Sequence, residues 1–184
     1  MRLPFASWKP RAVLFDLDGV LTDAAHVHAA AWADLFDDAL RRHASEASMP
    51  FHLFDRGADY PAFVDGRRRE DGVKVFPASR GIVLPEGAAS DAEDALTVAA
   101  LARRKQALLE AALRRERVEP APGAAELLWE LRRRGMPVAV VSASRNCADV
   151  LVAAGLDSMV DLRVDGMDAA RRGLAGKPAP RHLP

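Results

Sequence analysis

The chain has 184 residues, 49% of them apolar, which is enough for one ordinary domain or for a core with a smaller inserted domain. Lys plus Arg and Asp plus Glu both number 26, and the resulting net charge of zero argues against nucleic acid or an anionic membrane as a partner. The single cysteine, Cys147, excludes an internal disulfide and a cysteine-rich zinc site. We expect a soluble cytoplasmic protein, in which Cys147 is a small packing residue; the oligomeric state does not follow from the sequence.

The first predicted elements are a strand and a long helix. Residues 12–15 form a short apolar run that ends at Asp16 and is followed by Gly19, which predicts a buried parallel strand. The helix predicted after Asp23 carries one apolar stripe, made of Val27, Ala31, Leu35 and Ala39. Two pairs on its outer side have the favourable four-residue spacing of opposite charges: Asp37 with Arg41, and Asp38 with Arg42.

The segment 45–90 is rich in Pro, Gly, Asp and Arg, and its pattern does not determine its secondary structure. Ser90-Asp91-Ala92-Glu93 then fits a capping box, so we expect a helix from this point to about Arg117. A break follows at 120–123.

The last third of the chain alternates helices and strands. We expect a helix over 124–134 that Gly135 ends, a strand over 137–141, a helix over 146–154 that Gly155 ends, and a strand over 159–164. This order indicates an α/β fold, a doubly wound, Rossmann-like parallel sheet with an α-helical cap inserted after the first strand. The predicted division is core over 1–23, cap insertion over 24–118, and core again over 119–184.

One motif suggests chemistry directly. Phe15-Asp16-Leu17-Asp18-Gly19-Val20-Leu21-Thr22-Asp23 places two carboxylates two residues apart at the carboxyl end of the first strand, where open α/β sheets bind ligands. One carboxylate can attack a phosphorus atom to form an aspartyl-phosphate, and the other can give a proton to the leaving oxygen and later take one back. Crowded negative charge beside a phosphate implies Mg²⁺. An ordinary Asp-Gly turn is the alternative, and it accounts poorly for the whole pattern.

On this motif the sequence resembles the haloacid dehalogenase superfamily, and within it the β-phosphoglucomutase-like branch. The resemblance covers nearly the whole chain, although 45–90 matches loosely. It implies a Mg²⁺-dependent enzyme of phosphoryl transfer on small sugar phosphates, either a mutase between β-glucose 1-phosphate and glucose 6-phosphate or a sugar phosphatase. It also implies that Asp16 is the nucleophile and Asp18 the general acid/base, with Mg²⁺ held by an Asp16 oxygen and the Asp18 backbone carbonyl.

Two further family motifs follow in order. In Val141-Ser142-Ala143-Ser144-Arg145-Asn146 the resemblance assigns Ser142 to a phosphate oxygen, and in Gly-Lys-Pro-Ala-Pro it assigns Lys177 to charge on the nucleophile and phosphoryl group. A plain helix N-cap is the alternative for Ser142 and still more for Ser144. The residues near the phosphate that the resemblance assigns to substrate binding are Gly19, Ala143, Ser144 and Asn146.

The predicted cap contains four residues that match the mutase-like pattern. His28, with Trp32 four residues later, resembles the histidine that controls access and hydrogen-bonds the acid/base; a half-buried surface histidine is the alternative. Arg69 resembles the arginine that grips the non-transferring phosphate, whereas its neighbours Arg67 and Arg68 fit solvated side chains. Lys105 resembles a substrate-facing lysine, and a solvent-facing helix lysine is its alternative.

The resemblance stops after the lysine motif. Family members continue with a strand that ends in an acidic pair completing the Mg²⁺ site and with one further strand, so the C-terminal strands are expected to be missing. The usual codons for Asp-Thr-Phe-Leu, read one base early, encode the Arg-His-Leu-Pro of 181–184, and our hypothesis is a frameshift. We expect weak Mg²⁺ binding, poor solubility and little turnover. The alternative function is a non-catalytic remnant or a phosphosugar-binding protein.

Overall fold

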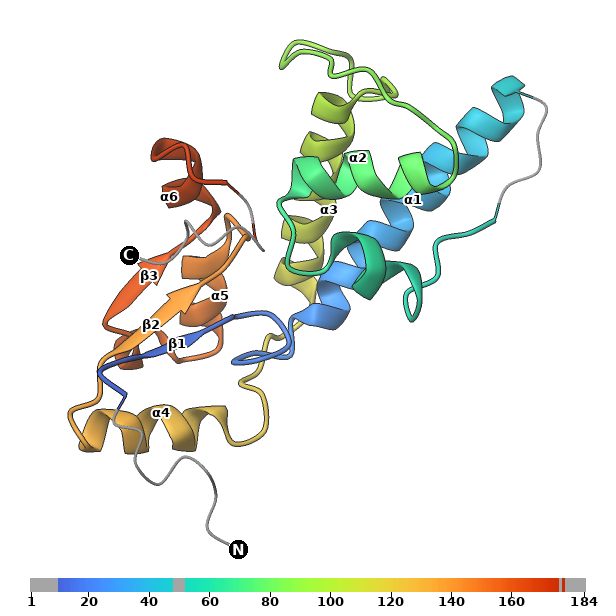
Figure 1. The fold of residues 1–184 in the computed structure, drawn as a ribbon. Coiled ribbons are helices and arrows are strands. Elements are labelled where there is room, and N and C mark those ends of the chain that lie inside the picture. The colour runs from blue at the N-terminus through green and yellow to red at the C-terminus, as the bar shows by residue number, and fades with distance from the viewer. Residues whose placement is uncertain (1–9, 48–51, 176, 178–184) are drawn as a thin grey trace, which may run out of the picture.

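The computed structural model describes residues 10–47, 52–175 and 177. Figure 1 shows a small sheet with its own helices beside a separate group of helices. The elements in chain order are β1 (Val13–Phe15), α1 (Ala25–Ala47), the π-helix η1 (Tyr60–Val64), α2 (Arg69–Ser79), α3 (Val98–Arg115), α4 (Ala124–Arg133), β2 (Val138–Val141), α5 (Cys147–Ala153), the 3-10 helix η2 (Asp157–Met159), β3 (Leu162–Val164) and α6 (Gly166–Arg171). None of the helices in these ranges is both long and apolar enough to cross a bilayer.

The sheet is parallel, with strand order β1-β2-β3. Val13 pairs with Val138 and Phe15 with Val140, while Val141 pairs with Val164 on the other side of β2. Since all three strands run the same way, the loops after β1 and β2 leave the sheet at one edge. The predicted α/β class with a parallel sheet is therefore confirmed.

Two of the three hydrophobic clusters found among the described residues are large, and each forms the centre of one part of the fold. The first joins Val138 and Val140 of β2 to Leu128 of α4 and to Val150 and Leu151 of α5. We call the part built on it the sheet region, which comprises the described residues of 10–23 and 119–177. It also buries Cys147 completely, as expected of a packing residue.

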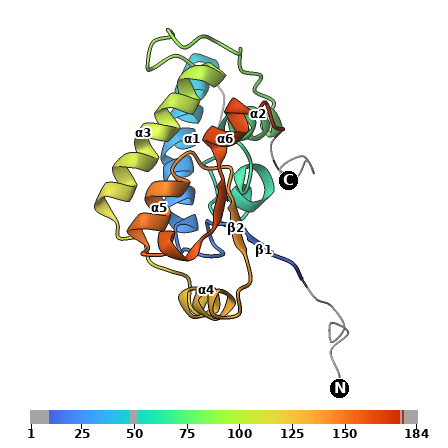
Figure 2. The same cartoon turned by 90° about the vertical axis from the view of Figure 1, so that its left-hand side faces the viewer.

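The second cluster lies among α1, α2 and α3. Its centre is a set of aromatic rings, in which the centroid of Phe36 lies 4.4 Å from that of Phe76 and 5.4 Å from that of Phe54. The described residues of 24–118 are called the helical region here, and Figure 2 shows α1 and α3 running side by side through it. Two clusters are compatible with the predicted core and cap, whose boundaries stay a prediction.

The start of α3 differs from the prediction. The helix begins at Val98 and not at Ser90, because Thr97 caps it by accepting a hydrogen bond from the backbone N–H of Ala100 at 3.2 Å. Asp91 accepts hydrogen bonds from Thr97 Oγ1 and from the Ala88 N–H, so it closes the loop before the helix. The capping box was therefore wrong.

Leu14 in β1 is 45% exposed, because β1 is an edge strand of the described sheet. One smaller expectation was wrong. Asp37 does not pair with Arg41. Its Oδ1 accepts a hydrogen bond from the backbone N–H of Phe54 at 2.8 Å, and this bond fixes the return of the chain toward α1. Asp38 lies 3.9 Å from Arg42, as predicted.

The chain crosses between the two regions twice, and the two crossings touch. The backbone N–H of Asp23 donates to the Glu119 carbonyl at 3.1 Å, and the Glu119 N–H donates to the Asp23 carboxylate at 2.9 Å. Ala121 N–H adds a bond to the Leu21 carbonyl at 2.9 Å. These three hydrogen bonds fasten the two crossings to each other.

Candidate active site

Asp16 and Asp18 are held by the loop that follows β1. Leu17, between the two aspartates, and Leu21, after them, are buried in the sheet region. These two side chains anchor the loop. Gly19 has φ 78°, and its N–H donates to the Thr22 carbonyl at 2.8 Å; this left-handed conformation favours glycine. Anchoring of this kind fixes both carboxylates at the carboxyl end of the strand.

Asp16 has two close partners. Its Oδ1 accepts a hydrogen bond from the Leu17 N–H at 2.9 Å and lies 2.6 Å from Lys177 Nζ. Both contacts use the same oxygen. Oδ2 therefore remains the oxygen that can attack an incoming group.

Asp18 is mostly buried, and its Oδ1 has no hydrogen-bond partner among the residues that the structure describes. Burial, followed by the charge of Asp16, raises the pKa of Asp18 to about 6, although Lys105 and Lys177 act in the opposite direction. A carboxyl group with such a pKa carries a proton for part of the time near neutral pH. Asp18 is thus better suited than Asp16 to give a proton to a leaving oxygen.

His28, Trp32 and Lys105 extend the site into the helical region. Lys105 Nζ lies 3.1 Å from His28 Nδ1 and 5.0 Å from the centroid of the Trp32 ring, and burial, with the charges of Lys105 and Arg69, lowers the pKa of His28. A neutral imidazole that accepts from Lys105 at Nδ1 carries its proton on Nε2, which points toward Asp18. The distance from Nε2 to Asp18 Oδ2 is 3.7 Å, so the expected hydrogen bond is not formed in this arrangement.

Ser142 approaches Asp16 from β2, because the two strands are neighbours in register. The Ser142 side chain is buried, and its Oγ accepts a hydrogen bond from the Ser144 N–H at 3.1 Å. Ser144 Oγ accepts in the same way from Asn146 N–H, so both serines shape the turn and neither is the residue at the N-cap of α5. Gly166 supports this turn from behind, because a Cβ there would lie 2.6 Å from the Ala143 carbonyl oxygen.

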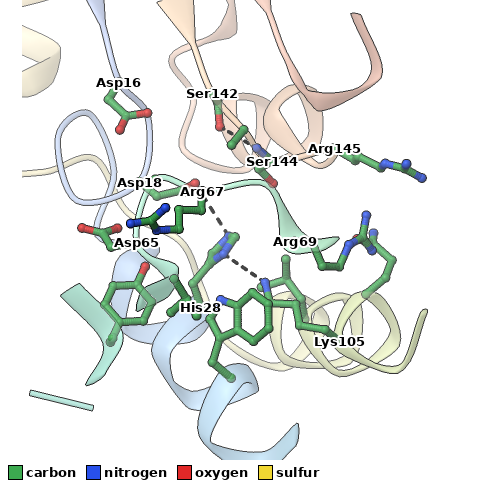
Figure 3. A pocket seen from close by; sticks show the side chains of 17 residues that line it. Asp16, Asp18, His28, Asp65, Arg67, Arg69, Lys105, Ser142, Ser144 and Arg145 are labelled. Carbon is green, nitrogen blue, oxygen red and sulfur yellow. Dashed lines mark hydrogen bonds and ion pairs between the residues drawn. The ribbon is translucent and has the colours of Figure 1, made fainter. Parts of the chain in front are cut away.

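Figure 3 shows how the residues from the two regions surround one cavity. The predicted residues that line it are Asp16, Asp18, His28, Trp32, Arg69, Lys105, Ser142, Ala143 and Ser144. Three predicted residues lie beside it. Lys177 reaches Asp16 from an adjoining hollow, Gly19 shapes the loop, and Asn146 accepts a hydrogen bond from Gln106 at 2.8 Å. Lys105 is only 4% exposed, which excludes the solvent-facing alternative.

Sequence reasoning missed five residues with polar or charged side chains that also line the cavity: Tyr60, Asp65, Arg67, Gln106 and Arg145. Three of them lie close in sequence to residues already singled out: Arg145 is within the second motif, and Asp65 and Arg67 flank the glycine before Arg69. Nothing in the sequence around Tyr60 indicates its place in the site. Arg68 was expected in solvent, but its guanidinium donates to the Leu174 carbonyl and so links the helical region to the sheet region.

The residues present fit a hard cation only in part. Among the residues that the structure describes, no three His, Cys, Asp or Glu side chains are grouped as metal ligands. Asp16 nevertheless offers a carboxylate oxygen, and the loop after β1 adds the backbone carbonyl of Asp18, so the Asp18 carboxyl group stays available as the proton donor. Such a donor set suits Mg²⁺, which commonly takes one or two carboxylates and fills its other positions with water and substrate phosphate.

The site thus combines a carboxylate pair after the first strand of a parallel sheet, a serine after the second strand and a lysine beside the first carboxylate. The chain matches the haloacid dehalogenase-like hydrolase family over residues 10–183 and belongs to it. It is 45% identical over 172 residues to a β-phosphoglucomutase of Mycobacterium bovis, an alignment that covers 94% of this chain and 66% of the relative. The chain therefore spans slightly less than two thirds of that relative.

Two solved structures have a similar fold. A β-phosphoglucomutase from Clostridium difficile superposes with a TM-score of 0.68 at 21% identity, covering 95% of this chain and 68% of the other. A family hydrolase from Deinococcus radiodurans, solved with bound phosphate and sodium, gives a TM-score of 0.55 at 27% identity and covers 92% and 62%.

Proposed function

We propose that this chain transfers phosphoryl groups of small sugar phosphates by way of an aspartyl-phosphate on Asp16. The observation that carries the proposal is the pair of Asp16 and Lys177, whose Oδ1 and Nζ lie 2.6 Å apart, whereas no hydrogen bond or ion pair from the described residues reaches Oδ2. A carboxylate whose charge is compensated on one oxygen can present the other to phosphorus. The 45% identity to a β-phosphoglucomutase supports the sugar phosphate as substrate class.

In the first step Asp16 Oδ2 forms a bond to phosphorus as the bond to the sugar oxygen breaks. Protonated Asp18 gives its proton to that oxygen, in agreement with its raised pKa. Ser142 can donate its hydroxyl proton to a phosphoryl oxygen, because its own oxygen already accepts from Ser144 N–H. In the second step Asp18 takes a proton from water or from a sugar hydroxyl. The oxygen of that acceptor bonds to phosphorus as the bond between phosphorus and Asp16 Oδ2 breaks, which restores the Asp16 carboxylate.

Mg²⁺, held by Asp16 and Asp18, would supply compensation of the negative charge that builds up between the nucleophile and the phosphoryl oxygens. The helical region, proposed as a cap over 24–118, would exclude bulk water through the buried set of His28, Trp32 and Lys105. Arg69 would bind a second, non-transferring phosphate, a task suited to its guanidinium. Transfer to a sugar hydroxyl makes the enzyme a mutase, and transfer to water makes it a phosphatase.

The test is capture of the phosphoenzyme. The full chain is incubated with Mg²⁺ and acetyl phosphate, and its intact mass is measured beside that of the Asp16→Asn variant. We expect one added phosphoryl group in the natural chain and none in the variant. An unlabelled natural chain that still binds glucose 6-phosphate would overturn the proposal and would indicate a phosphosugar-binding protein.

Products identify the acceptor once labelling is established. With β-glucose 1-phosphate as substrate, a mutase yields glucose 6-phosphate, whereas a phosphatase yields glucose and inorganic phosphate. Asp18→Asn should keep the nucleophile and lose most turnover of this sugar, about 100-fold or more, because its leaving group needs a proton.

A further inference from the structure

Glu70 lies between two arginines that come from different regions. Its Oε1 is 4.0 Å from Arg69 Nε and 3.7 Å from Arg145 Nη2. Arg69 and Glu70 begin α2 in the helical region, whereas Arg145 follows β2 in the sheet region. Figure 3 shows Arg69 and Arg145 on the side of the cavity away from Asp16.

Arg69 is ready to bind an additional anion. Its side chain is 12% exposed, and its Nη1 already donates to Gln106 Oε1 at 2.7 Å and to the Ala102 carbonyl at 3.3 Å. Its Nε is buried and has no hydrogen-bond partner in the described structure. A buried guanidinium N–H without an acceptor is unfavourable, so a better acceptor than Glu70 would be bound there.

The contacts of Glu70 are loose enough to be exchanged. Both distances exceed the roughly 2.7–2.9 Å of a charge-assisted hydrogen bond. The side chains of Glu70 and Arg145 are 45% and 44% exposed, so both are accessible to solvent and to an incoming anion. Burial lowers the pKa of Arg69; the charge of Glu70 raises that pKa, and the charge of Arg145 lowers it.

We propose that Glu70 occupies the place of the substrate's non-transferring phosphate and competes with that phosphate for Arg69 and Arg145. In the empty site the carboxylate reduces the repulsion between the two guanidinium groups. A phosphate brings three acceptor oxygens to the same groups and displaces it. Glu70 thus lowers the affinity for sugars with two phosphates and favours release, without touching the reacting phosphoryl group. The idea rests on the proposed function only in taking the displacing anion to be a sugar phosphate.

Asp71 provides a matched control. It also carries a carboxylate in the first turn of α2, and it forms no ion pair with an arginine within the ranges that the structure describes. Glu70→Gln and Asp71→Asn therefore remove the same charge from adjacent positions, and only the first removes the proposed competitor. Both substitutions keep the shape of the side chain, so the fold is preserved.

The experiment measures equilibrium affinity by calorimetry in an Asp16→Asn background, where the nucleophile is removed. Glucose 1,6-bisphosphate is the probe with a distal phosphate, and inorganic phosphate is the probe without one. We expect Glu70→Gln to bind the bisphosphate about fivefold more tightly, the size of a partly exposed ion pair, with phosphate affinity unchanged. Asp71→Asn should stay within about twofold for both probes.

Unchanged or weaker bisphosphate binding by Glu70→Gln would overturn the proposal, and so would an equal gain in Asp71→Asn, which would indicate a general effect of charge. Labelling of Asp16 is measured separately in the natural chain. If labelling fails while Glu70→Gln still binds the bisphosphate more tightly, the proposed function falls and the role of Glu70 stands. If labelling succeeds and the affinities do not change, the proposed function stands and the role of Glu70 falls.

Discussion

Lys105 is a buried cation, and its replacement by methionine is expected to stabilise the protein near and below neutral pH. The side chain is 4% exposed. Burial lowers its pKa from 10.5 to about 7; the charge of Arg69 adds to this effect and the charge of Asp18 opposes it. His28 at 3.1 Å and the Trp32 ring at 5.0 Å are the other groups that face the ammonium.

The pH dependence follows from these pKa values. Between pH 7 and pH 10.5 the unfolded chain holds the Lys105 proton more often than the folded protein does, so stability rises with pH. Below pH 7 both states are charged, and the full unfavourable effect of the buried charge remains. From pH 7 to pH 9 the free energy of unfolding of the natural protein should rise by about 2 kcal/mol, and that of Lys105→Met should lack this rise. For a chain of this length that corresponds to about 5 °C in Tm.

The assay is thermal unfolding followed by circular dichroism at both pH values. Lys105→Met should melt above the natural protein at pH 7, and the difference should shrink by about 5 °C at pH 9. The control is Lys74→Met, since Lys74 is 45% exposed and pairs with Glu86. The Tm difference between this variant and the natural protein should be the same at both pH values. A Tm difference that is equal at the two pH values, or a less stable Lys105→Met at pH 7, would refute the argument.

Three further substitutions or reactions test the fold. Phe36→Ala should lower the free energy of unfolding by about 3 to 5 kcal/mol in urea titrations, because the ring is buried among aromatics, whereas exposed Trp129→Ala should change it by less than about 1 kcal/mol. Thr97→Ala should cost about 1 kcal/mol through the lost cap of α3, and Ser90→Ala should cost nothing measurable; the opposite order would restore the capping box. Cys147 should resist iodoacetamide at pH 8 in the folded protein and react in denaturant, because burial raises its pKa to about 12; rapid alkylation of the native thiol would contradict its buried position.

The sequence was sufficient where short-range signals determine structure. The apolar run before Asp16 predicts β1, and the apolar spacing closed by Gly135 predicts α4, whose last residue differs by one. The position of the two aspartates at the carboxyl end of β1 also follows from the sequence, because they come directly after that strand. Short-range patterns of this kind depend on few neighbours, and tertiary contacts do not override them.

Elsewhere, distant contacts decide. The sequence does not decide whether Lys105 faces the substrate or the solvent, because a lysine on a helix is ordinarily solvated. Only the packing of α1 against α3 buries this side chain. The start of α3 depends on a hydrogen bond between Thr97 and Asp91 that closes a loop, which no apolar periodicity records. The meeting of Glu70 with Arg145 joins positions 75 residues apart in the printed numbering and exists only in the folded chain.

The double crossing between the two regions has a mechanical consequence. Because Asp23 and Glu119 bind each other, and Ala121 binds Leu21, the two crossings behave as one pivot and not as two independent tethers. Two fastened crossings resist sliding and twisting and leave one easy rotation, about the line through the fastening. Figure 1 shows α2 and α6 farther from this pivot than the first turn of α1 is. A rotation of the helical region about that line would have to break the hydrogen bond from Arg68 to the Leu174 carbonyl.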